Sequence, residues 1–488
     1  MIVRNEERNL RDCLEPIASL FDEIVIVDTG SQDATKQIAG RFTPHVLDFP
    51  WCDDFSAARN ESLKRARGDW VFWLDADDRV RSENVGRLHN LLDGLEDSLR
   101  VYYMDTLLHG QYECEGAHVL SHPRLFRRHP ELHWRNRVHE QLRPDMTQLG
   151  YETAWSDIQI DHLGYQNVAL RQRKLQRDLR LLRMDYATDP TNCSTLFHLA
   201  LAYSELRNHP EARKLLGRMQ AADDGTKDCM ARVYRVLAEL SLREGDTEGT
   251  LRILAEGLAR FPRRDGLLYM QANVLFELGR YEETRISLEQ IMDGPDTREH
   301  HAVPCDIKRK LAPRKLADVF RLKKQFDLAE RVLQRVIQDF PSDTHAWYAL
   351  GCVYGDTSQE ASLHAVIERL RNCPNGEIFA DMLLAAWHMQ QRELEPAGIL
   401  INRLIGSSPE VPLPRVLLCQ WLEMMGAPLE ARMRACRDVL KVQPANAQAR
   451  MTLSMLENSR LALTAPVISE CCTSAQVNGD YFSAICVG

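Results

Sequence analysis

The sequence lacks any run of about 18 consecutive apolar residues, so no ordinary membrane-spanning helix is expected. It also lacks an excess of positive charge, because 61 Lys and Arg face 70 Asp and Glu, for a formal net charge of -9. A polycationic nucleic-acid-binding protein is therefore not expected, although a local basic patch is compatible with this balance. Glycine is limited to 25 residues and aromatic residues to 7%, which disfavours a β-rich fold along the whole chain.

The cysteines also lack the spacing of a structural site. There are 13 of them, an odd number, and none forms a CxxC pair. This pattern favours reduced thiols over a disulfide framework or a zinc site. The first residues contain no basic stretch followed by an apolar one, so no secretory signal peptide is expected. Together these absences predict a soluble, cytoplasmic and mostly helical protein.

The character of the sequence changes near residue 170. Before that point, two short runs at 24–27 and 70–74 are β-branched or aromatic, which predicts strands buried on both faces. Residues 33–39 and 56–66 are good helix formers. The alternation of strands and helices predicts an α/β domain over residues 1–165 with a parallel sheet, whose first strand is short.

After this region the sequence becomes helical and repetitive. Small residues recur in register, and the last five register positions are each 34 residues apart. The register positions are Ala200, Ala238, Ala272, Ala317, Gly351, Ala385, Cys419 and Leu453. A 34-residue period of paired helices is typical of tetratricopeptide repeats, in which small residues allow two helices to cross closely. A long helical bundle would also place Ala and Leu at helical spacing, but unbroken steps of 34 residues disfavour it.

The repeat arithmetic gives a domain organisation for the rest of the chain. We expect a helical linker at 166–192, a solenoid of about seven helix pairs at 193–457, and an irregular C-terminal tail at 458–488. The fold class predicted from the residues is an α/β domain followed by an all-α tetratricopeptide-type solenoid.

One acidic motif follows the first predicted central strand. Asp28 stands at the carboxyl end of residues 24–27, where ligands bind to open α/β sheets. A carboxylate there, followed by a turn at Gly30, can hold a nucleotide base or ribose. The simpler alternative is a helix N-terminus capped by Ser31 or Asp33.

A second acidic motif follows residues 70–74. Asp75 and Asp77 are two residues apart at a strand end, so their carboxylates point to the same side. Such a pair can hold a hard divalent cation against a diphosphate. An acidic surface turn is the alternative, but two such motifs after successive strands favour a site for a nucleotide and a metal ion.

Four ordered blocks, at residues 1–7, 22–35, 49–62 and 68–78, carry a resemblance to a known family. The chain resembles the GT-A-type glycosyltransferases of family 2, in the subgroup that carries tetratricopeptide repeats and includes S-linked peptide glycosyltransferases. The resemblance extends from residue 1 to about 165. It implies a Rossmann-like GT-A domain, followed here by the predicted solenoid.

The resemblance also implies roles for individual residues. The residues that bind the nucleotide-sugar would be Asn5, Glu6, Asp28, Arg59, Asn60 and Asp75. The ligands of Mn²⁺ or Mg²⁺ would be Asp75, Asp77 and His162. The catalytic base would be Glu140, with His139 or Asp161 as alternatives. Independently of the resemblance, Arg124, Arg127 and Arg128 stand close before Glu140, where they could bind the diphosphate or simply form a basic face.

The function implied by the resemblance is that of an inverting, divalent-metal-dependent hexosyltransferase. It would move a sugar from a UDP- or GDP-sugar donor to a peptide, protein or glycan acceptor, and the repeats would bind the acceptor or a partner. The alternative is a tetratricopeptide scaffold whose transferase domain has lost its activity. The retention of Asp28, Asp75, Asp77 and Glu140 argues against that alternative.

Overall fold

The structure, a computed structural model, describes residues 1–108, 118–164, 168–222, 229–295, 303–304, 306–409, 411–443 and 446–464. The chain falls into two compact units. The first is Met1–Pro262 with Thr297–Cys305, and the second is Arg263–Asp296 with the chain from Asp306 onward. In the part of the chain that the structure describes, no helix is both long and apolar enough to cross a bilayer.

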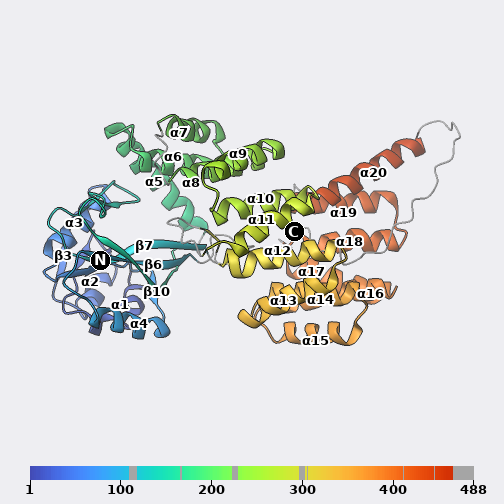
Figure 1. The fold of residues 1–488 in the computed structure, drawn as a ribbon, viewed down its shortest axis with the longest axis horizontal. Helices are drawn as coiled ribbons and strands as arrows, with labels where there is room; N and C mark the ends of the chain where they lie inside the picture. The colour runs from blue at the N-terminus through green and yellow to red at the C-terminus, as the bar shows by residue number, and fades with distance from the viewer. Residues whose placement is uncertain are drawn as a thin grey trace. The chain divides into compact units, whose positions relative to one another are not determined.

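The first unit begins with an α/β region built on two main sheets (Figure 1). In the first sheet, β1, β2 and β3 run parallel in that order. The second sheet has the order β11-β7-β6-β10-β5, with β4 also paired to β7, and β8 and β9 form a small separate ladder. The strands are β1 (Ile2–Val3), β2 (Ile26–Asp28), β3 (Val46–Asp48), β4 (Trp70–Phe72), β5 (Asp78–Val80), β6 (Arg100–Leu108), β7 (His118–Arg127), β8 (His133–Arg135), β9 (Gln141–Arg143), β10 (Glu152–His162) and β11 (Val303–Pro304).

Short helices connect these strands, and longer helices follow them. The helices of the α/β region are α1 (Leu10–Leu14), η1 (Ala18–Leu20), α2 (Thr35–Ala39), α3 (Phe55–Arg65) and α4 (Ser82–Asp93). The first unit continues with α5 (Val168–Thr188), α6 (Cys193–Glu205), α7 (His209–Ala221), α8 (Met230–Arg243) and α9 (Thr247–Arg260). Helix α5 lies within the stretch predicted as a helical linker.

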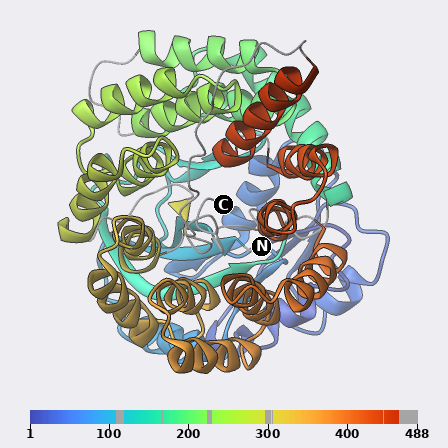
Figure 2. The same cartoon turned by 90° about the vertical axis from the view of Figure 1, so that its right-hand side faces the viewer.

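The second unit is helical throughout its described residues. Its elements are α10 (Asp265–Glu277), α11 (Tyr281–Asp293), η2 (Ile307–Leu311), α12 (Ala312–Leu322), α13 (Phe326–Asp339), α14 (Thr344–Asp356), α15 (Glu360–Arg371), α16 (Glu377–Gln390), α17 (Leu394–Ser407), α18 (Leu413–Met424), α19 (Leu429–Val442) and α20 (Ala447–Thr464). Figure 2 shows its yellow, orange and red helices as successive antiparallel pairs. The predicted fold class, an α/β region followed by helical repeats, is confirmed. Of the predicted C-terminal tail, residues 465–488 lie outside the described residues.

The prediction of a parallel strand at 70–74 that is buried on both faces is wrong. Strand β4 covers only Trp70–Phe72, pairs antiparallel with β7, and has side chains that are only partly buried. Its partner lies about fifty residues further along the chain. An apolar run reveals that a strand forms but not the direction of the strand beside it. The run at 24–27 fares better, because β2 is fully buried and parallel to both neighbours, although it begins two residues later and ends on Asp28.

Six of the eight register residues of the repeats are buried where their helices cross, whereas Cys419 and Leu453 are partly buried. The alanines of the register, Ala200, Ala238, Ala272, Ala317 and Ala385, are at most 1% exposed. A Cβ atom at Gly351 would overlap Leu383 and lie 3.2 Å from Val366 Cγ1. Small side chains are therefore required here by the close approach of neighbouring helices, as the repeat pattern predicts.

The turns inside the helix pairs share a second register that the sequence shows less clearly. Seven residues after each register position from Ala200 to Cys419 stands a residue with positive φ. These residues are Arg207, Gly245, Gly279, Lys324, Ser358, Arg392 and Gly426. In every case the next backbone N–H donates to the carbonyl five residues earlier, as Asp246 N does to Ser241 O at 3.0 Å. This is the Schellman C-cap, and each first helix of a pair ends in it.

Candidate active site

Asp28 ends β2 and is fully buried. Its Oδ1 atom accepts hydrogen bonds from the backbone N–H groups of Gly30 at 2.9 Å and Ser31 at 2.8 Å. The Lys36 ammonium lies 3.9 Å from the same oxygen. Its Oδ2 atom is buried and makes no hydrogen bond to the described residues. Leaving a carboxylate oxygen buried and unpaired is costly, so this atom suits a donor supplied by a ligand.

The loop after β1 is fastened to the loop after β2. The Asn5 Oδ1 atom accepts from Gln32 N at 2.8 Å, and Glu6 N donates to Thr35 Oγ1 at 2.7 Å. Asn5 adopts the left-handed backbone conformation, with φ of 55°. Glu6 Oε2 accepts from Asn9 Nδ2 at 2.8 Å. Asn5 and Glu6 thus lie beside the Asp28 loop, as predicted, but the Asn5 amide oxygen and the Glu6 backbone N–H hold the two loops together, and the Glu6 carboxylate pairs with Asn9.

Arg59, on α3, bridges two of the predicted site carboxylates. Its Nη2 atom lies 2.7 Å from Asp75 Oδ1, and its Nε atom lies 2.5 Å from Glu140 Oε1. Its guanidinium also lies over the rings of Trp73, at 4.7 Å, and Trp134, at 5.3 Å. Burial alone raises the pKa of Asp75, but the charge of Arg59 outweighs it and holds that pKa well below its usual range. The structure therefore places Arg59 as the group that orients Asp75 and Glu140.

Asn60 also contacts the protein rather than open solvent. Its Nδ2 atom donates to Trp134 O at 2.9 Å, and its Oδ1 atom accepts from Trp134 N at 2.7 Å. This pair of bonds fastens β8 to α3. The second N–H of Asn60 Nδ2 remains for a contact to the sugar donor.

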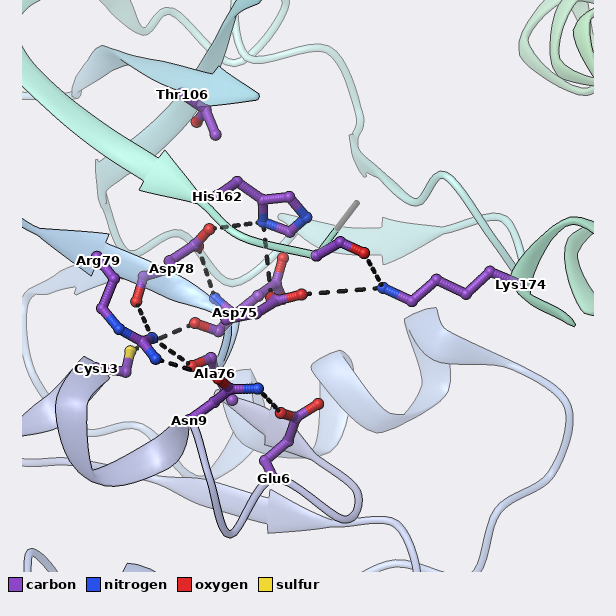
Figure 3. A network of polar contacts seen from close by, with 12 residues as sticks. Glu6, Asn9, Cys13, Asp75, Ala76, Asp78, Arg79, Thr106, His162 and Lys174 are labelled. Carbon is purple, nitrogen blue, oxygen red and sulfur yellow. Dashed lines mark hydrogen bonds and ion pairs between the residues drawn. The ribbon is translucent and has the colours of Figure 1, made fainter. Parts of the chain in front are cut away.

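Asp77, Asp78 and His162 form a group whose ligand atoms all lie within 4.8 Å of one another. The antiparallel pairing of β5 and β10 places Asp78 directly opposite His162. His162 Nδ1 lies 2.9 Å from Asp78 Oδ1 (Figure 3). The same atom lies 3.6 Å from Asp77 Oδ1. The predicted ligands Asp77 and His162 thus come together, whereas the third member is Asp78 rather than Asp75.

Asp78 is largely occupied by the protein itself. Its Oδ2 atom accepts from Arg124 Nη1 at 2.8 Å and from Asp75 N at 2.9 Å. Arg124 is 1% exposed and also donates to Thr106 Oγ1 at 3.0 Å. Arg124 is therefore a buried partner of Asp78 and does not form a basic face.

Arg127 and Arg128 have surface partners. Arg127 lies 2.7 Å from the exposed Asp97 carboxylate, and Arg128 donates to Gly68 O at 3.0 Å.

Gly164 lies directly beside Asp77 and His162. A Cβ atom at this position would lie 2.5 Å from Asp77 Oδ2, 2.8 Å from His162 Nε2 and 3.2 Å from Lys174 Nζ. The three side chains therefore converge on a space that only glycine leaves open. Burial raises the pKa of Asp77. Burial would lower the pKa of His162, but its bond to Asp78 and the charge of Asp77 raise it instead. One or two carboxylates with an imidazole are donors that suit Mn²⁺, and carboxylates also suit Mg²⁺.

The two alternative bases occupy different surroundings from Glu140. The ring of His139 stacks on His198 of α6, with ring centres 3.8 Å apart. Asp161 accepts two bonds from Arg81, at 2.5 and 2.7 Å. Glu140, by contrast, shares Arg59 with Asp75. Of the three candidates, Glu140 is the one that Arg59 ties to the acidic loop.

Comparisons with known proteins find similarities in both parts of the chain. Residues 1–133 match the model of glycosyl transferase family 2, and residues 315–343 match that of the tetratricopeptide repeat. A TPR repeat-containing protein of Synechococcus elongatus is 31% identical over 264 residues, 51% of this chain and 63% of that protein. The SPbeta prophage-derived glycosyltransferase SunS of Bacillus subtilis is 27% identical over 210 residues, 40% of this chain and 46% of that protein. A solved tetratricopeptide repeat protein from Parabacteroides merdae covers 56% of this chain and 94% of its own at 16% identity, with a TM-score of 0.39.

The N-terminal part of the chain is therefore a glycosyl transferase family 2 domain, joined in one chain to tetratricopeptide repeats. The chain spans less than two thirds of the length of these two curated relatives.

Sequence reasoning assigned no role to Asp78, Gly164 or Lys174. Asp78 ends the sequence block at 68–78, but only the pairing of β5 with β10 brings it opposite His162. Lys174 carries no motif that would separate it from the other cations of α5.

Proposed function

We propose that this protein transfers a sugar from a nucleotide-activated donor to an acceptor, with inversion at the anomeric carbon. The observation that carries the proposal is the convergence of Asp77 and His162 beside Gly164, in a chain whose first 133 residues match a glycosyltransferase family. An acidic surface turn would not require a glycine that leaves room for a carboxylate and an imidazole at once.

The donor nucleotide is proposed to bind along the first sheet. The unpaired Oδ2 atom of Asp28 would accept a hydrogen bond from the base, and the loop with Asn5 and Glu6 would border the same pocket. A uracil or guanine base offers N–H donors for a carboxylate, which supports a UDP- or GDP-sugar. The Oδ2 atom of Asp75 remains for the ribose or diphosphate, since its side chain is 31% exposed and only Oδ1 contacts Arg59.

Mn²⁺ or Mg²⁺ is proposed to be held by Asp77 and His162, with Asp78 close behind. When bound, such an ion neutralises the charge that develops on a departing diphosphate. Asp78 would contribute mainly by fixing His162 through Oδ1, because its Oδ2 atom already accepts from Arg124 and the backbone of Asp75.

Glu140 is proposed as the general base. Its carboxylate would take the proton of an acceptor hydroxyl or thiol while that oxygen or sulfur bonds to the anomeric carbon. The bond from that carbon to the phosphate oxygen breaks, and its electron pair leaves with the nucleoside diphosphate. Arg59 holds Glu140 through Oε1 and so leaves Oε2 to face the acceptor. Glu140 is only 12% exposed, which favours a defined orientation.

The helical repeats are proposed to contribute to acceptor binding. His139, next to Glu140, stacks on His198 of the first helix pair, so the repeats begin immediately beside the proposed base. By the family resemblance, the acceptor is a peptide, a protein or a glycan. No described feature favours the alternative of an inactive scaffold.

Hydrolysis of UDP-, GDP- and TDP-sugars, with and without Mn²⁺, tests this proposal. We expect slow, metal-dependent release of one nucleoside diphosphate by the wild-type protein. Glu140→Gln should lower turnover by about 10²- to 10⁴-fold, the usual contribution of a general base, and leave donor binding nearly unchanged. Glu152→Gln, a matched change at an exposed residue of β10, should have no effect. Equal losses of binding and turnover in Glu140→Gln would place the base elsewhere. The absence of both binding and turnover in the wild-type protein would favour the scaffold.

A further inference from the structure

Lys174 extends from α5 toward the acidic loop between β4 and β5. Its ammonium lies 3.9 Å from Asp77 Oδ2 and donates to Gly164 O at 3.3 Å. Figure 3 shows Glu6, His162 and Lys174 approaching the Asp75–Asp78 turn from different sides. Both His162 and Lys174 lie beyond residue 133, where the match to the family 2 model ends.

Two nearby arginines hold the carboxylates of this turn. Arg124 is buried against Asp78 and Thr106. Arg59 holds Asp75 and Glu140. Lys174 differs from both because its side chain is 30% exposed, so a ligand can reach it, and because it lies next to Asp77 instead of behind the loop.

The positions of Glu6 and Gly164 show that this ammonium belongs to the same small region as the candidate metal ligands. Burial raises the pKa of Glu6, the charge of Asp77 raises it further, and Lys174 opposes both. A Cβ atom at Gly164 would touch Asp77, His162 and Lys174 together. An anion that reaches Asp77 through a bound divalent cation would therefore also lie within reach of the Lys174 ammonium.

We propose that Lys174 binds the terminal phosphate of the nucleoside diphosphate, as a residue of the transfer site supplied by the helix that precedes the repeats. This inference rests on the proposed function. In the transfer step, the bond between the anomeric carbon and the β-phosphate oxygen breaks, and the electron pair stays on that oxygen. Lys174 donates a hydrogen bond to this β-phosphate and stabilises the added charge. A nucleoside monophosphate has no phosphate in this position.

Calorimetric titration of the full chain with UDP, UMP, GDP and GMP in the presence of Mn²⁺ tests the assignment. Lys174→Met should weaken binding of the diphosphate by about ten- to a hundredfold, the usual worth of a hydrogen bond from a charged group. Binding of the matching monophosphate should change by no more than about threefold, because it lacks the contact. Lys174→Arg should restore part of the diphosphate affinity.

Two controls isolate the contribution of the Lys174 ammonium. Arg173→Met removes one positive charge from the exposed residue directly before Lys174 in α5. It should leave the affinities for the monophosphate and the diphosphate unchanged. Titration with Mn²⁺ alone shows whether Lys174→Met alters the metal ligands. Suppose that the wild-type protein binds a diphosphate. If Lys174→Met then weakens the binding of mono- and diphosphate equally, or leaves both affinities unchanged, the assignment of Lys174 is wrong and the proposed function stands. If the wild-type protein binds none of the four nucleotides, the proposed UDP- or GDP-sugar donor is wrong, and the assignment of Lys174 to its diphosphate is wrong with it.

Discussion

Gly164 offers a direct steric test of the candidate active site. The substitution Gly164→Ala adds one methyl group at a residue that does not need a positive φ, so the backbone tolerates it. The new Cβ atom would lie 2.5 Å from Asp77 Oδ2 and 2.8 Å from His162 Nε2. Both atoms lie at the ends of side chains that can rotate about their χ angles, so they can move away and the fold can persist.

The size of the effect follows from these distances. An ordinary contact needs about 3.5 Å between heavy atoms, so Asp77 Oδ2 must withdraw by about 1 Å and His162 Nε2 by about 0.7 Å. Metal ligation tolerates deviations of only about 0.2 Å. A displacement of about 1 Å in a catalytic group costs on the order of a hundredfold in rate. The cost to the free energy of unfolding should stay near 1–2 kcal/mol, as for a tight fit of one added methyl group.

The assay compares Mn²⁺-dependent donor hydrolysis by Gly164→Ala with that by Gly86→Ala. Gly86 is exposed within α4, and an added Cβ atom there meets nothing within 4 Å. This control should keep full activity and gain roughly 0.5–1 kcal/mol of stability, the usual advantage of Ala over Gly inside a helix. We expect Gly164→Ala to lose about a hundredfold in turnover and to need more Mn²⁺, while its circular dichroism spectrum stays unchanged. Wild-type turnover with wild-type Mn²⁺ dependence would refute the placement of the metal at Asp77 and His162.

Two further predictions concern stability. Arg207→Gly and Arg392→Gly should each raise the free energy of unfolding by about 0.5 kcal/mol. The left-handed conformation costs a residue other than glycine about 1–2 kcal/mol. Part of this gain is offset because glycine loses more conformational entropy on folding. Urea unfolding measures this change, and Gly279→Ala at the equivalent turn should have the opposite sign. Burial, with help from Arg124, lowers the pKa of His122 to about 3, below its ordinary value of 6.5. Between pH 6.5 and 3, the His122 imidazole is therefore protonated in the unfolded chain but neutral in the folded chain. The free energy of unfolding decreases as the pH falls through this window. His122→Phe should make the protein lose about 1–2 kcal/mol less between pH 7 and pH 5, and an unchanged difference would remove His122 as a cause.

The sequence predicts the site best where its chemistry is local. Asp28 and Asp77 each follow a short apolar run, so a motif of a few residues is enough to find them. The role of Arg59 cannot be predicted in this way. Its partner Glu140 and the ring of Trp134 come from elements that follow long after α3, and only the folded chain brings them together. The same reason applies to Asp78, whose partner His162 depends on the register of β5 and β10.

The repeats illustrate a different limit. Steps of 34 residues identify the paired helices because close crossings admit few side chains. The turn register is visible in the sequence only at Gly245, Gly279 and Gly426. At the other four turns the same Schellman cap is made by arginine, lysine or serine, because the helices on either side stabilise it by more than the modest cost of positive φ.

The net charge of -9 can now be related to particular carboxylates. Asp75 and Asp78 each give one oxygen to an arginine and so maintain the shape of the acidic loop. Asp28 and Asp77 differ, since the Oδ2 atom of Asp28 is buried without a hydrogen bond, and Asp77 faces an imidazole and an ammonium at 3.6 and 3.9 Å. If every carboxylate of the site were paired with a group of the protein, the fold would gain stability. No carboxylate would then be left to bind a nucleotide base or a metal ion. The two less satisfied carboxylates are therefore the ones at which a nucleotide and a metal ion would gain the most binding energy.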